Sequence, residues 1–85
     1  MKPPLTSPEI VERANQARRV LDDPTLQKAM EEVRQSLLRH LEATTIGDRD
    51  THHEIALSLQ ALRSIRRVLE NWVTDGEVEQ KRNAH

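Results

Sequence analysis

Apolar side chains recur every three or four residues along two stretches of the N-terminal half, which is the period of an amphipathic helix. The pattern predicts a helix over about 8–21 and a second over about 24–43. Each of these helices has one narrow apolar stripe, suited to one neighbouring helix. The stripe of the second helix consists of Leu26, Met30, Val33, Leu37 and Leu41.

A third helix, predicted over about 52–74, differs because it carries two apolar stripes. The first stripe consists of Ile55, Leu59, Leu62, Leu69 and Val73, and the second of Leu57, Ala61, Val68 and Trp72. At about 100° per residue, the two stripes are turned roughly 100° apart around the helix. A helix that is apolar over half its circumference is contacted from two directions.

Short capping motifs mark the start of each predicted helix. Ser, Thr and Asp are favoured as N-caps, and proline is welcome at the first helical position. A Thr and a Glu three residues apart form a capping box. The two cap–proline pairs are Ser7–Pro8 and Asp23–Pro24, and the capping box is Thr51–Glu54.

The predicted fold is an all-α, three-helix arrangement within a single domain of residues 1–85. Gly47 lies in the segment between the second and third helices, where a left-handed glycine would end the second helix. Because this segment is short, the two long helices should form an antiparallel hairpin, preceded by the shorter N-terminal helix. The polar ends, 1–6 and 77–85, are expected to be flexible tails.

Composition excludes several classes of protein. The 85 residues include no Cys, which excludes disulfides and Cys-based zinc sites. The net charge of −1 gives no overall attraction to nucleic acid or to an acidic membrane. No apolar run approaches the roughly 18 residues of a membrane span, and the N-terminus lacks the apolar core of a signal peptide. We expect a soluble cytoplasmic protein that does not enter a membrane.

Histidines near the predicted hairpin tip raise the question of a metal site. A hairpin would bring His40 close to His52 and His53, with aspartates in the turn between them. Adjacent histidines point about 100° apart on a helix, so at most one of the pair could converge with His40. The carboxylates elsewhere are scattered among basic partners at helical spacing. We therefore predict no metal, no cofactor and no enzymatic activity.

The segment RSIRR at 63–67 is the strongest basic cluster in the chain. Arg63 and Arg67 share a face one turn apart, and Arg66 lies nearer the apolar stripe. Arginines a turn apart can contact successive phosphates. Arg18, Arg19 and Arg34 could join them if the first helix folds alongside. The simpler interpretation is that these arginines form a solvated face or make ion pairs between subunits.

Residues 17–78 resemble a loosely defined class of small helical proteins encoded in tailed-phage genomes and prophages. The shared pattern is an LxxDPxLQxAMxxV opening, seen here as LDDPTLQKAMEEV, then a T…DR turn, a helix of the LQALRxIRxxLE kind and a closing DG. In that class such proteins tend to be encoded near head and packaging genes. The resemblance implies a virion-associated or assembly role, in the host cytoplasm and the virion, and it assigns no functional residue.

These observations favour a non-enzymatic protein–protein interaction module. Its predicted interface is the second stripe of the third helix, Leu57, Ala61, Val68 and Trp72. The second helix can cover only one of the two stripes, so the other needs either the first helix or a further copy of the chain. Because the first helix is short and half of its stripe is alanine, the expected partner is a second copy of the chain or a larger protein assembly. The alternative is a small nucleic-acid-binding regulator that uses Arg63, Arg66 and Arg67.

Overall fold

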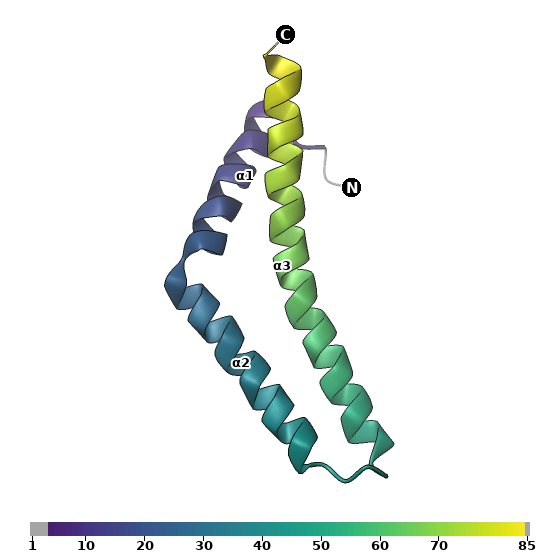
Figure 1. Cartoon of the computed structure of the whole chain (residues 1–85). Coiled ribbons are helices and arrows are strands. Elements are labelled where there is room, and N and C mark those ends of the chain that lie inside the picture. The colour runs from purple at the N-terminus through teal and green to yellow at the C-terminus, as the bar shows by residue number, and fades with distance from the viewer. Residues whose placement is uncertain (1–3, 85) are drawn as a thin grey trace. The chain divides into compact units, whose positions relative to one another are not determined.

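The protein is all-α and consists of three helices, α1 (Ser7–Asp22), α2 (Pro24–Ala43) and α3 (Arg49–Asn83) (Figure 1). This is a computed structural model, and it describes residues 4–84. No strand occurs within that range. The prediction of an all-α chain with three helices is confirmed.

The start of α1 differs by one residue from the sequence prediction. Thr6, rather than Ser7, is the N-cap, and its Oγ1 accepts a hydrogen bond from the Glu9 backbone N–H at 3.4 Å. Glu9 completes a capping box, because its carboxylate accepts bonds from the Thr6 hydroxyl at 2.8 Å and from the Thr6 backbone N–H at 3.3 Å. These bonds hold the pKa of Glu9 below its ordinary value.

The turn between α2 and α3 is closed without a left-handed glycine. Neither glycine of the described chain has a positive φ, so the expectation for Gly47 was wrong. Instead, the Thr44 hydroxyl donates to the His40 carbonyl at 2.6 Å, and the Thr44 N–H donates to the Leu41 carbonyl at 3.2 Å. Thr44 thus satisfies two carbonyls that the end of α2 leaves free.

Helix α3 begins earlier than predicted, at Arg49, because Asp48 acts as its cap. The Asp48 carboxylate accepts hydrogen bonds from the Thr51 backbone N–H at 3.1 Å and from the Thr51 hydroxyl at 2.8 Å. The predicted capping box, with Thr51 as the cap, was therefore misplaced by three residues. Thr51 is the donor in this cap rather than the acceptor.

Helix α3 also continues well beyond its predicted end at Thr74. It runs through Gly76, which is buried, and ends at Asn83. Residues 77–83, expected to belong to a flexible tail, are therefore helical. In the expected N-terminal tail, residues 1–6, Thr6 is the N-cap of α1 and is therefore held in place. The extreme ends of the two expected tails, residues 1–3 and His85, lie outside the described residues.

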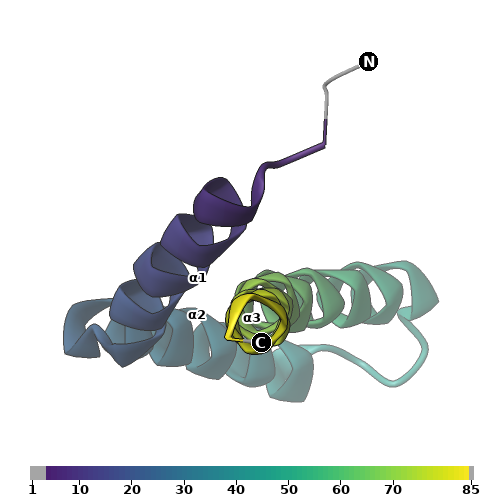
Figure 2. The ribbon, with the colours of Figure 1, turned by 90° about the horizontal axis from the view of Figure 1, so that it is seen from above.

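The chain divides into two compact units, and α3 contributes to both. Unit 1 contains α1 and the part of α3 from Arg66 onward, and unit 2 is Pro24–Ile65. In unit 1, α1 lies beside the C-terminal part of α3 (Figures 1 and 2). The buried residues of this contact, Ala14, Ala17 and Gly76, are all small, which lets the two helices approach closely.

Polar contacts flank the small-residue contact of unit 1. The Ser7 hydroxyl donates to Glu79 at 2.5 Å and accepts from the Asn83 amide at 2.9 Å. Two ion pairs, each with an N–O separation of 3.6 Å, join Arg13 to Asp75 and Arg18 to Glu77. Glu77, Glu79 and Asn83 all lie beyond the predicted end of α3, so the extra turns of that helix have partners on α1.

The packing of unit 2 is sparse. Ile55 is its one buried residue, with 4% of its surface exposed. Val33, which the sequence places at the centre of the α2 stripe, is 50% exposed. The remaining members of the expected hairpin core are half-buried: Leu26, Met30, Leu37, Leu41, Leu59 and Leu62.

Candidate interaction surface

The four predicted interface residues of α3 have two different environments. Leu57 and Val68 are 51% and 44% exposed, and Ala61 is also exposed. Trp72 is half-buried, and the Arg13 guanidinium of α1 lies over its indole ring, 4.8 Å from the ring centre. Three of the four side chains are thus exposed within the described chain, and the fourth takes part in the α1–α3 contact.

Ile65 belongs to the same face and was missed by the sequence analysis. It is 54% exposed and follows Ala61 by four residues, the spacing that places side chains on one face of a helix. The four-residue spacing from Ala61 would have been sufficient to assign Ile65 to this face from the sequence.

The face of α3 between positions 57 and 72 carries no charge, although 32% of the chain is charged. Two serines complete this face, and each hydroxyl donates to a carbonyl of its own helix: Ser58 to Glu54 at 3.0 Å and Ser64 to Gln60 at 2.9 Å. Hydroxyls that already have a partner can be buried at little cost. We call this surface the uncharged face: Leu57, Ser58, Ala61, Ser64, Ile65, Val68, Asn71 and Trp72.

The arginine cluster lies elsewhere on the circumference of α3. Arg63, Arg66 and Arg67 are all exposed, and Arg66 pairs with Glu70 at 3.9 Å. Arg63 and Arg67 form no ion pair within the described residues.

The other arginines considered with this cluster are already paired with carboxylates. Arg18 pairs with Glu77, Arg19 with Glu12, and Arg34 with Glu31. Hydrogen bonds from Gln35 and Arg34 hold the pKa of Glu31 below its ordinary value.

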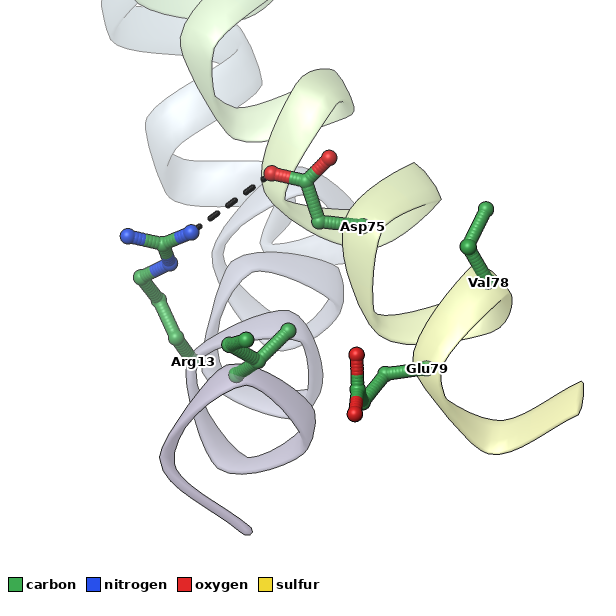
Figure 3. A pocket seen from close by; sticks show the side chains of 5 residues that line it. Arg13, Asp75, Val78 and Glu79 are labelled. Carbon is green, nitrogen blue, oxygen red and sulfur yellow. Dashed lines mark ion pairs between the residues drawn. The ribbon is translucent and has the colours of Figure 1, made fainter. Parts of the chain in front are cut away.

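A hollow of about 240 Å³ lies between α1 and α3 within unit 1 (Figure 3). Its lining consists of Ile10, Arg13, Asp75, Val78 and Glu79. The charged groups at its rim already hold α1 against α3, since Arg13 pairs with Asp75 and Glu79 accepts from the Ser7 hydroxyl.

Asp48, the aspartate that precedes α3, is a helix cap. Hydrogen bonds from the Thr51 backbone and side chain hold the pKa of Asp48 below its ordinary value, with smaller contributions from the charges of His52 and His40. Within residues 4–84, no group of three or more His, Asp or Glu side chains is placed to hold a metal ion.

None of the helices in the described part of the chain is both long enough and apolar enough to cross a membrane. Comparisons with protein families, with characterised proteins and with solved structures find no match to this chain.

Proposed function

We propose that the chain is a non-enzymatic protein–protein interaction module that binds through the uncharged face of α3. In this proposal α2 and the first half of α3 form an antiparallel hairpin, which holds the face outward. The partner is a second copy of the chain or a larger protein assembly. The observation that carries the proposal is the exposure of Leu57, Ile65 and Val68 on a surface without charges.

Association through this face is favoured by burial of apolar surface. Fully burying a Val, Leu or Ile side chain contributes about 1.5–3 kcal/mol, and these three side chains are now about half exposed. The face has no charged group whose loss of hydration would oppose binding. Contiguous exposed apolar surface of this kind marks interaction sites in soluble proteins.

A new charge in the centre of the face tests the proposal. Ala61→Glu should abolish self-association, because the new carboxylate would be buried without a partner. Gln60→Glu is the matched control, since it adds the same group at the neighbouring exposed position but outside the face. Light scattering at micromolar concentration should show assembly for the control and a monomer for Ala61→Glu. Equal masses for the two variants would place the interface elsewhere.

We propose a phage particle or its assembly as the setting, in the host cytoplasm and the virion. The support is the resemblance of residues 17–78 to small helical proteins encoded near phage head and packaging genes. An uncharged helical face suits this role, since one copy can bind an identical face of the next.

The second candidate is a small nucleic-acid-binding regulator that uses Arg63, Arg66 and Arg67. It is supported by the exposure of all three side chains and by the unpaired charges of Arg63 and Arg67 within the described chain. Binding driven by phosphate contacts weakens steeply with salt. DNA binding at low salt that falls at moderate salt, and that Arg63→Glu with Arg67→Glu removes, would favour this candidate.

A further inference from the structure

The arginines of α3 that have no carboxylate partner are aligned along one side of the helix. Arg49, Arg63 and Arg67 are exposed and form no ion pair within the described residues. At about 100° per residue, positions 49 and 67 point in the same direction around the helix, and position 63 is turned by about 40°. At about 1.5 Å per residue, the three arginines span about 27 Å of α3. We call this side, from Arg49 to Arg67, the basic stripe.

The basic stripe has no carboxylate between its first and last arginine. The positions that share its direction are taken by exposed residues without a negative charge: His53, Ala56 and Gln60. The acidic residues of this part of α3, Asp50 and Glu54, are turned about 100° and 140° away from Arg49. Arg66 is turned about 100° from Arg67 and pairs with Glu70. The positive charge of the stripe is therefore not neutralised by its own helix.

We propose that the basic stripe binds the phosphate backbone of double-stranded nucleic acid without reading its sequence. A guanidinium suits this partner because it donates two parallel hydrogen bonds to phosphate oxygens. The stripe carries no Trp, Tyr or Phe on which an unpaired base could stack, which favours a duplex over a single strand. It also carries no large apolar side chain that could enter a lipid surface, which favours nucleic acid over a membrane.

This inference rests on the second candidate function and changes its site. The site extends from the cluster at 63–67 to Arg49, about 21 Å before Arg63 at about 1.5 Å per residue, and Arg66 lies outside it. The uncharged face points elsewhere, since Ala61 is turned about 120° from Arg49. One copy can therefore use both surfaces, and self-association would bring several stripes to one duplex, which raises the overall affinity.

The salt dependence of binding measures how many of the arginines meet phosphates. Each neutralised phosphate contributes about 0.9 to the slope of log affinity against log salt concentration, so three arginines predict a slope of about −2.7 per copy. Arg49→Gln should flatten the slope by about one third, whatever the number of copies bound. Arg66→Gln is the matched control, because it removes the same charge from α3 outside the stripe and should change the slope much less. Glutamine is close to arginine in helix propensity, so α3 should be retained in both variants.

The experiment follows the fluorescence anisotropy of labelled mixed-sequence DNA duplexes between about 50 and 200 mM salt. We expect two duplexes of unrelated sequence to bind with similar affinity, and more tightly than the single strand. An unchanged slope for Arg49→Gln would overturn the stripe, although the second candidate would survive if Arg63→Gln with Arg67→Gln still flattened it. Tighter binding to the single strand, or to phosphatidylserine vesicles, would overturn the choice of a duplex. No binding to any DNA at low salt would contradict the second candidate itself.

Discussion

At Gly76 the backbone of α3 lies against Ala14 of α1. A Cβ added to Gly76 would overlap the Cβ of Ala14. Because the Ala14 Cβ is attached directly to the backbone, no side-chain rotation can relieve this overlap, and the helices would have to separate. Glycine here is required by the close approach of two helices, although in an isolated helix it would be less favourable than alanine.

Gly76→Ala should therefore destabilise unit 1, despite its intrinsic preference for helix. Overpacking of this kind costs about 1–3 kcal/mol, whereas the gain in helix propensity from glycine to alanine is about 1 kcal/mol. The measurement is urea unfolding followed by the fluorescence of Trp72, the single tryptophan of the chain, which lies in this unit. An unfolding midpoint equal to or above that of the unaltered protein would contradict the close contact.

A double-mutant cycle provides the control for that experiment. Ala14→Gly restores the space that Gly76→Ala occupies, at the cost of one glycine in α1. The variant with both changes should be more stable than the sum of the two single effects predicts. Simple additivity would mean that the two residues do not touch.

The hydrogen bonds that Asp48 accepts predict that its pKa lies below the ordinary value for an aspartate. Since they favour the charged carboxylate, the folded-state pKa lies below that of the unfolded chain, and the resulting stability is present above the unfolded value. It is lost as pH falls through the folded pKa. Thr51→Val removes the hydroxyl donor but keeps the backbone N–H, so the Asp48 pKa should rise part of the way toward its ordinary value. An NMR titration of the carboxyl carbons measures this, and an unchanged pKa would contradict the cap.

At the level of elements, the C-terminal turns of α3 depend on contacts that are distant in sequence. The local pattern around Gly76 and the polar segment after it is typical of a helix end, and it led to the predicted boundary at Thr74. The helix continues because Glu77 and Glu79 contact Arg18 and Ser7 of α1. Periodicity within a single helix carries no information about such partners, so the three helices were predictable but the length of α3 was not.

Deleting residues 77–85 tests whether these turns support α1. The deletion removes the partners of Ser7 and Arg18 and shortens the surface on which α1 packs. Helix content by circular dichroism should fall by more than the deleted turns account for, and the Trp72 emission should change as α1 loosens. If the segment were only a flexible tail, both signals would remain those of the full chain.

The sparse core of unit 2 predicts unequal effects of truncation. Ile55→Ala removes the one buried side chain of that unit and should cost about 2–5 kcal/mol. Leu57→Ala, at an exposed position two residues away, should change the stability of a monomeric sample by about 0.5 kcal/mol or less. Thermal unfolding by circular dichroism at high dilution compares the two variants. Similar losses of stability in the two variants would show that the buried side of α3 has been assigned wrongly.

At the scale of the whole molecule, the candidate surface was predictable in part. Helical spacing alone identified Leu57, Ala61 and Val68, because exposure follows from the side of α3 on which they lie. Spacing could not show that Trp72 is held by Arg13, since that contact joins α1 to the far end of the chain.

We propose above all that the protein associates with itself through the exposed, uncharged face of α3. Sedimentation equilibrium of the unaltered protein, over a dilution series from tens of micromolar downward, measures this most directly. We predict the mass of a dimer or a larger assembly at the high end, falling toward the monomer on dilution while the helix content stays constant. A monomer at every concentration would contradict the claim.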